Sequence, residues 1–316
     1  MREIGGYIEL DRYSKTMLHE NALALNCGRN ALAYLIEARN IKKISMPYFM
    51  CDSCDRVFEQ YAVTVKYYHI DCKFLPVNVE LEEEEWLYIV NFYGQINNDI
   101  LEGLKKNFKY IIVDNTQSYF QMPLEGVDTL YSCRKYFGVP DGAFLYSDSY
   151  LDRELLVDES FERMHFLLGR FERSANEFYS EYVENNELFY YVPIKQMSRL
   201  TWNLLHGIDY EEVAQTRTDN FLYLHNVFAK QNKLQLDVPY GAFMYPLYVK
   251  DADEIRNELQ KIKIYIPILW PNVLEGCDRD AIEYNLSKNI LPLPIDQRYG
   301  REEMKYMEDV IRKYID

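Results

Sequence analysis

Two residues of this chain could together carry amine and acid chemistry, and they are Asp114 and Lys135. Residues 111–113 are a short apolar β-branched run, which is typical of a strand buried on both faces, and Asp114 follows it directly. Open α/β sheets bind ligands just beyond the carboxyl ends of their strands. Lys135 comes later, ahead of a turn-rich stretch at 138–142 and a second apolar strand at 143–146. We therefore expect a two-part site.

The chemistry of such a pair follows from the residue types. A lysine amine attacks carbonyls only when it is deprotonated, and a neighbouring cation such as Arg134, with partial burial, favours the neutral amine. A carboxylate at a strand end can keep a heteroaromatic nitrogen protonated. Pyridoxal phosphate requires these two groups, a lysine for the Schiff base and an acid at the pyridinium nitrogen. The alternative is that Asp114 caps the following turn and Lys135 is a solvated surface lysine.

The order Asp-x-x-Gln, Gly-x-Asp, Ser, Lys and a Gly-rich turn resembles the DegT/DnrJ/StrS sugar aminotransferases, which are fold type I pyridoxal phosphate enzymes. The resemblance implies that Lys135 is the Schiff-base lysine and that Asp114 pairs with the pyridinium nitrogen. It further implies that Gln117 contacts the ring face or its hydroxyl, and that Ser132 is a phosphate ligand. The spacing from this serine to the lysine is shorter here than is usual in the family.

A second part of the cofactor site is expected at the start of a helix. The amphipathic pattern after residues 26–28 predicts a helix that begins there. A Gly-containing turn at a helix N-terminus exposes amide N–H groups, which together with the helix dipole favour a phosphate, although an ordinary helix cap looks the same. The resemblance places Gly28, Arg29 and Asn30 on the phosphate-holding turn. Arg29 replaces the usual threonine and could pair with phosphate bidentately or point to solvent.

Two further patterns leave alternatives open. Phe49 or Tyr48, shortly after a strand-ending proline, stands where the family has an aromatic stacked on the pyridine ring, and ordinary core packing is the alternative. Cys51-x-x-Cys54 lacks the second ligand pair that a zinc site needs, and it lacks a thioredoxin-like context. We interpret it as two packed thiols at a helix start.

One motif of the chain also fits another protein family, and two segments depart from the aminotransferase pattern. Ser132-x-x-Lys135 fits the Ser-x-x-Lys motif of penicillin-binding acyl transferases, but their Lys-Thr-Gly motif is absent. Asp141-Gly142 stands where the family commonly has Glu-Gly. Residues 190–193 lie where the family carries an Asn-x-Arg-like segment that reaches a neighbouring subunit's phosphate, and the asparagine is not evident.

Composition limits the classes of function. The net charge of −15 argues against nucleic acid and anionic membranes as partners. Six cysteines in 316 residues are too few for a disulfide scaffold and suit a reducing compartment. No apolar run reaches the roughly 18 residues of a membrane helix, and the first residues lack a signal-peptide core. We expect a cytoplasmic protein with no metal, nucleic-acid or membrane partner.

Strand and helix patterns alternate through the first half, which is the signature of a parallel sheet covered by helices. We predict an α/β fold of type I, with a large pyridoxal-phosphate-binding domain at 1–208 whose mostly parallel sheet is flanked by helices. A small C-terminal α+β domain is predicted at 209–316. Its expected elements are helices at 209–230, 252–261 and 301–314 and strands at 243–249 and 263–269. The acidic run at 82–85 is expected to lie in water.

The resulting hypothesis is an aminotransferase that acts on a nucleotide-linked keto sugar, with glutamate as the amino donor, in surface-polysaccharide or amino-sugar biosynthesis. The family implies a homodimer. A second hypothesis is a catalytically weak or inactive pyridoxal-phosphate-binding protein of the same fold, suggested by the missing asparagine. A third is sugar dehydration, but relatives that dehydrate often replace the lysine, and Lys135 is present.

Overall fold

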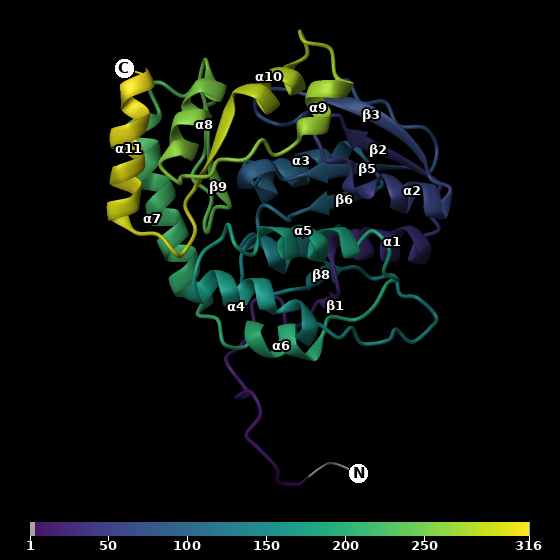
Figure 1. Cartoon of the computed structure of the whole chain (residues 1–316). Helices are drawn as coiled ribbons and strands as arrows, with labels where there is room; N and C mark the ends of the chain where they lie inside the picture. Colours follow the sequence, from purple (N-terminus) through teal and green to yellow (C-terminus); the bar gives the residue numbers. More distant parts are fainter. Residues whose placement is uncertain (1–3, 316) are drawn as a thin grey trace.

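The computed structural model describes residues 4–315, and its centre is a mixed sheet of eight strands in the order β1-β8-β7-β6-β5-β2-β3-β4 (Figure 1). Strands β3, β2, β5, β6 and β7 run parallel, whereas β8 is antiparallel to both β7 and β1, and β4 is antiparallel to β3. The strands are β1 (Leu23–Leu25), β2 (Lys43–Pro47), β3 (Thr64–Ile70), β4 (Pro76–Val77), β5 (Glu85–Val90), β6 (Ile111–Asp114), β7 (Asp128–Ser132) and β8 (Ala143–Tyr146).

Strand β6 shows why the apolar runs predicted the sheet correctly. All four of its residues are buried, as expected for a central parallel strand with both faces covered. Asp114 is the last residue of β6, and it pairs with Val90 on one side and Leu130 on the other. The carboxyl ends of β5 and β6 therefore meet at one edge of the sheet, with the acid on that edge.

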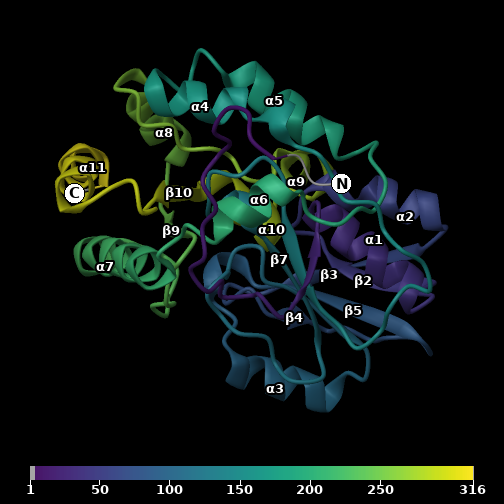
Figure 2. The ribbon, with the colours of Figure 1, turned by 90° about the horizontal axis from the view of Figure 1, so that it is seen from below.

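Helices cover both faces of this sheet. Figure 2 shows α3 on one side and α1, α2 and α5 on the other. Helix α1 begins at Gly28, at the predicted place, and the Cys27 Sγ caps it by accepting from the Asn30 amide at 3.4 Å. The helices of this half are α1 (Gly28–Ala38), α2 (Asp55–Tyr61), α3 (Asn98–Asn107), α4 (His165–Glu172), α5 (Tyr179–Leu188) and α6 (Arg199–Leu205). The predicted α/β architecture is confirmed.

The C-terminal part comprises α7 (Tyr210–Phe228), β9 (Met244–Tyr248), α8 (Ala252–Lys261), α9 (Pro271–Gly276), α10 (Ile282–Asn289), β10 (Ile290–Pro294) and α11 (Arg301–Ile315). Helices α7 and α11 lie side by side in a small layer beside the sheet (Figures 1 and 2), whereas α9 and α10 pack on the sheet core. Buried side chains from α7, β9, α8, β10 and α11 share one apolar cluster. The boundary at 208/209 stays a prediction, because Leu205 and Ala214 on its two sides belong to one cluster.

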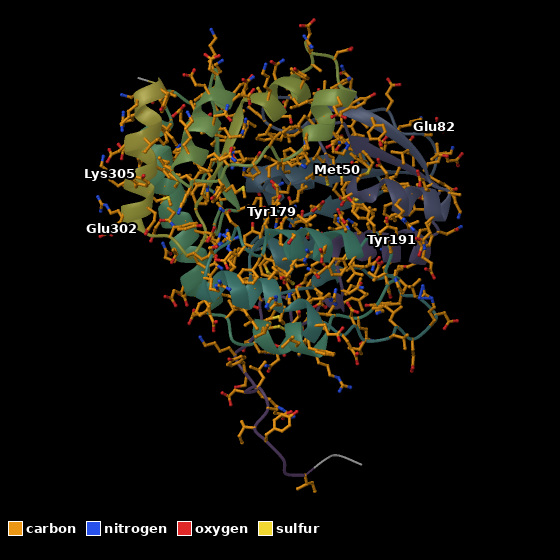
Figure 3. The ribbon with its side chains drawn as sticks, viewed as in Figure 1. Met50, Glu82, Tyr179, Tyr191, Glu302 and Lys305 are labelled. Atoms are coloured by element: carbon orange, nitrogen blue, oxygen red, sulfur yellow. The ribbon has the colours of Figure 1, made fainter. Side chains whose placement is uncertain are left out.

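Two sequence predictions about this architecture are wrong. Residues 263–269 form no strand, since the antiparallel partner of β9 is β10, which pairs Ile290 with Tyr248. Pro267 interrupts the expected strand and cannot donate to a ladder. The acidic run is not wholly solvated: Glu82 lies at the outer edge of the molecule (Figure 3), but Glu85 is 1% exposed and accepts from the Ser45 hydroxyl at 2.7 Å. A buried carboxylate needs such donors.

No helix among residues 4–315 is long and apolar enough to cross a membrane. All six cysteines are free. In the same part of the chain, no group of three or more metal-ligating side chains is placed to hold an ion.

The N-terminal segment reaches the core through His19, which is fully buried. Its Nε2 lies 2.8 Å from the Tyr119 carbonyl oxygen, so that nitrogen carries the proton and donates, while Nδ1 accepts from the Tyr146 hydroxyl at 3.1 Å. The ring packs 4.1 Å from the Tyr131 ring. Burial lowers the pKa of His19 to about 4.

We predict that folding stability decreases as the pH falls from about 6.5 to about 4, because unfolded His19 takes up a proton in this range and the folded ring does not. The difference between the two pKa values corresponds to at most about 3 kcal/mol. Urea unfolding of the wild type and of His19→Gln at several pH values measures this contribution. The variant should show a flatter dependence on pH, and an unchanged slope would contradict the assignment.

Candidate functional site

Asp114 is held at the sheet edge by two donors. Its Oδ1 accepts from the Thr116 amide at 2.8 Å and its Oδ2 from the Tyr88 hydroxyl at 2.9 Å, and the carboxyl group is almost fully buried. Burial and the adjacent Asp114 carboxylate raise the pKa of Tyr88 well above its ordinary value, so this hydroxyl keeps its proton and donates. Each carboxylate oxygen has a second acceptor position, so Asp114 can accept one more hydrogen bond from a ligand.

Lys135 meets this acid through one intermediate residue. The lysine ends the short helix η3 (Cys133–Lys135) after β7, and its Nζ donates to the Thr116 Oγ1 at 3.0 Å. The same Thr116 gives its amide to Asp114. The amine and the acid, which the sequence analysis expected to converge, are therefore joined through the two polar groups of Thr116.

The surroundings of Lys135 differ from the expectation in two respects. The lysine is exposed rather than partly buried. Arg134 does not accompany it, because its Nη2 donates to the Asn186 Oδ1 and its guanidinium lies 4.7 Å from the centre of the Phe189 ring. Neighbours in sequence diverge here because successive side chains of a tight turn point in different directions. The environment of the amine is set instead by Thr116 and by the Phe243 ring, whose centre lies 5.7 Å from Nζ.

The start of α1 borders the same place. Gly28 is the first residue of the helix, and a Cβ atom built there would lie 3.9 Å from the Thr116 Cγ2. The N-terminus of α1 therefore lies beside Thr116, the residue that Lys135 contacts. Helix N-termini carry free amide N–H groups and a partial positive charge, which favour an anion.

The side chains of Arg29 and Asn30 are engaged elsewhere. The Arg29 guanidinium stacks 3.8 Å over the Tyr190 ring and donates to the Asn186 carbonyl at 3.0 Å. Asn30 donates to the Asn26 Oδ1 and the Pro193 carbonyl, both at 2.9 Å. These contacts tie α1 to α5 and the segment after it. Both side chains are therefore engaged within the chain, which leaves the backbone amides at the start of α1 as the candidates for binding a phosphate.

Of the other predicted residues, Gln117 and Ser132 are polar and lie close to Thr116 and Lys135 in the chain, whereas Phe49 lies in the apolar core. Gln117 follows Thr116, and its Oε1 accepts from the Tyr93 amide at 2.9 Å, which leaves its NH2 end to donate. Ser132 is half-buried at the end of β7, directly before the η3 turn. Phe49 is fully buried, packed 4.3 Å from Trp270 and 5.1 Å from Phe92. The stacking role expected for Phe49 is not supported, because core side chains cover its ring.

Cys51 and Cys54 line a cavity of about 220 Å³ at the carboxyl ends of β2 and β3. Burial raises the pKa of the Cys54 thiol far above its ordinary value. A protonated thiol is neither a nucleophile nor a metal ligand. For Cys54 the interpretation as a packed thiol agrees with the geometry, whereas Cys51 is half-buried.

Thr116 and Tyr88 belong to the site but were not predicted from the sequence. Thr116 lies within the Asp-x-x-Gln motif, but a threonine after a strand gives no signal by itself. Tyr88 lies on the neighbouring strand, where it pairs with Ile112, two residues before the acid. Its hydroxyl reaches Asp114 because of the register in which β5 pairs with β6. The pattern of apolar and polar residues in the sequence does not reveal that register.

No protein-family model and no curated protein matches the sequence. Solved structures share the fold. A DegT DnrJ EryC1 StrS aminotransferase from Brucella abortus superposes with a TM-score of 0.64 at 15% identity, covering 93% of this chain and 86% of that chain. DesV from S. venezuelae, solved in complex with a ketimine intermediate, gives 0.65 at 14% identity, with 93% and 85% covered.

A putative sugar aminotransferase, Spr1654 from Streptococcus pneumoniae, in its PMP form, gives a TM-score of 0.64 at 14% identity over 94% of this chain and 88% of that one. These likenesses establish the fold, and they confirm the predicted fold type I architecture. They do not show how the side chains of the site are arranged in this chain.

We predict that Tyr88→Phe lowers the free energy of unfolding by about 1.5–3 kcal/mol, since it removes a buried hydrogen bond to a charged group. Tyr68→Phe is the matched control, because the Tyr68 hydroxyl is buried too but donates at 2.7 Å to the neutral Tyr88 carbonyl. Its loss should be about 0.5–1.5 kcal/mol. Urea denaturation measures both, and equal losses would argue against an ionised Asp114.

Proposed function

We propose that this chain is a pyridoxal-phosphate-dependent aminotransferase of the DegT/DnrJ/StrS type. The observation that carries the proposal is the hydrogen-bonded connection from the Lys135 amine through Thr116 to the Asp114 carboxylate, at the sheet edge where such folds bind ligands. Support comes from similar structures that are described as sugar aminotransferases and include a PLP form and a PMP form.

The residues present fit the cofactor. Asp114 is buried and retains acceptor capacity for a pyridinium N–H, and Lys135 is exposed with its amine within reach of the same place. The N-terminus of α1 at Gly28, beside Thr116, suits a phosphate, with Ser132 and Gln117 as further polar groups around the cofactor. When bound, pyridoxal phosphate supplies the electron sink that makes a carbon-bound proton acidic.

The chain's own residues then have distinct tasks. Asp114, fixed by Tyr88 and the Thr116 amide, would hold a proton on the ring nitrogen. The Lys135 amine would carry a proton between substrate and cofactor, as a general base and acid. The Thr116 hydroxyl accepts from Nζ and would keep the amine oriented when it is not covalently engaged. The exposure of Lys135 leaves a route for the substrate.

The finer assignment is a nucleotide-linked keto sugar as amino acceptor and glutamate as donor, in amino-sugar or surface-polysaccharide biosynthesis in the cytoplasm. It is supported by the sugar aminotransferases among the similar structures. We also propose a homodimer. Large apolar side chains are exposed on and beside α4 and α5, among them Phe171 at 91% and Tyr179 at 63%. Tyr179 is labelled in Figure 3. A partner surface would remove them from water.

The alternative is a pyridoxal-phosphate-binding protein without efficient turnover. The contacts of Arg29 and Asn30 with α5 and the segment after it favour it, because they leave the phosphate to backbone amides. Glutamate distinguishes the two hypotheses. An aminotransferase converts bound pyridoxal phosphate to pyridoxamine phosphate when glutamate is added, and the yellow colour fades. A binding protein keeps its colour.

We predict that purified wild-type protein with pyridoxal phosphate is yellow and that borohydride fixes the cofactor to Lys135. Lys135→Ala should lose this linkage and lower transamination by about 10²- to 10⁴-fold, as expected for loss of a general acid–base group. Lys233→Ala is the control, because Lys233 is also an exposed lysine near an aromatic ring, 5.3 Å from the centre of Tyr248. A colourless Lys135→Ala protein that still transaminates would refute the role of the lysine.

A further inference from the structure

A buried arginine joins the C-terminal part of the chain to the loop that carries Lys135. Arg217 of α7 is 1% exposed. Its guanidinium donates to four neutral acceptors, which are Gln297 Oε1 at 2.8 Å, Ala242 O at 3.1 Å, Phe243 O at 3.3 Å and Tyr136 O at 3.4 Å. The nearby Asp296 carboxylate also favours the charged guanidinium, but the direct acceptors are neutral, and burying a charge among them is costly. An apolar side chain could fill the space at lower cost, which indicates that these contacts have a positioning role.

The contacts converge on the carbonyl group of Tyr136, the residue that follows the lysine. The Tyr136 carbonyl accepts from Arg217 and, at 2.8 Å, from the Gln297 Nε2. The Arg217 guanidinium also lies 4.5 Å from the centre of the Tyr136 ring. Both donors come from the C-terminal part, and they are tied to each other through the Gln297 Oε1. The backbone directly after Lys135 is therefore fixed from outside the sheet.

The same arginine places the aromatic wall beside the amine. Its bond to the Phe243 carbonyl holds the residue whose ring centre lies 5.7 Å from the Lys135 Nζ. The chain reaches that point through Gly241, which has a φ of +64° and whose added Cβ would lie 2.2 Å from the Phe120 ring. The approach is too close for any other residue. Arg217 thus sets the position of Phe243 relative to the lysine loop.

We propose that Arg217 and Gln297 are positioning residues, forming a clamp that holds Lys135 through the Tyr136 carbonyl and Phe243 and couples C-terminal packing to the reactivity of the lysine. The catalytic part of this inference rests on the proposed function. The mechanical part, that the clamp orients the Lys135 amine, does not. Neither residue touches the reacting atoms, so both act through Lys135.

The test compares Arg217→Lys and Gln297→Met with Asn220→Ala. Asn220 lies one turn further along α7, is 5% exposed and donates to the Ile295 and Tyr299 carbonyls. It therefore makes the same kind of tie, from α7 to the segment after β10, without touching the lysine loop. Loss of packing alone should lower thermal stability in all three variants.

Two measurements separate positioning from packing. The first, without cofactor, is the rate at which trinitrobenzenesulfonate labels Lys135 relative to the other lysines, mapped by peptide mass spectrometry. The second is the rate of formation of the borohydride-reducible linkage with pyridoxal phosphate. In both clamp variants, labelling should rise and linkage formation should slow by about 10- to 100-fold, the effect of misplacing a reacting group by about 1 Å. Asn220→Ala should match the wild type in both.

If Lys135 behaves in both clamp variants as it does in Asn220→Ala, the clamp proposal is wrong. If Arg217→Lys does not fold, Gln297→Met alone decides, because Gln297 is only half-buried and its side chain contributes one donor and one acceptor to the clamp. If the wild type takes up no pyridoxal phosphate, the proposed function fails. The labelling comparison still decides the clamp.

Discussion

The site depends on the parallel pairing of β5, β6 and β7, because parallel strands bring their carboxyl ends to a single edge. Asp114 ends β6, and the turn that carries Lys135 begins where β7 ends. Their separation in the chain is bridged by strand pairing, and Thr116 spans the remaining distance with its amide and its hydroxyl. A shift of one residue in the register of β6 would turn the acid to the opposite face of the sheet. The packing of the sheet therefore sets the geometry of the candidate site.

Beside the acid in the chain, buried and half-buried amide side chains form a hydrogen-bond network between two loops at this edge. Asn91 donates to the Asn115 Oδ1 at 3.0 Å and to the Gln121 Oε1 at 2.9 Å, and Gln121 donates to the Ile96 carbonyl at 3.0 Å. These bonds tie the loop after β5 to the loop after β6. Gln117 joins the same two loops through the Tyr93 amide. Buried polar groups satisfied in this way fix one arrangement, because leaving any of them without a partner is costly.

The C-terminal part contributes to the site indirectly. Its own apolar cluster holds α7, β9, β10 and α11 together. Arg217 and Gln297 connect these elements to the Tyr136 carbonyl, next to the lysine. A second tie lies on the far side, where Glu283 is fully buried and accepts from the Ile70 amide at 2.8 Å. The C-terminal part therefore contacts the sheet at several places, and the contact made by Arg217 and Gln297 lies at Tyr136, next to Lys135.

The sequence by itself determined the sheet and the helix that begins at Gly28, and it singled out Asp114 and Lys135, which the structure joins through Thr116. Those features are local: a β-branched run, a glycine turn before an amphipathic pattern, and an acid and a lysine at strand ends. The resemblance to the aminotransferase family also indicated the fold correctly. Only the tertiary structure decided how the lysine is held, since Thr116, Tyr88 and Arg217 act through strand register and contacts between distant segments.

Tertiary packing likewise decided where sequence expectation failed. The Phe49 ring is covered because Trp270, far away in the sequence, packs against it. Residues 263–269 form no strand because the partner of β9 is Ile290–Pro294. Arg29 and Arg134 both turned to Asn186 of α5, which no local pattern links to them. Side-chain direction depends on which long-range partner is nearest, and a pattern of neighbouring residues contains no information about that partner.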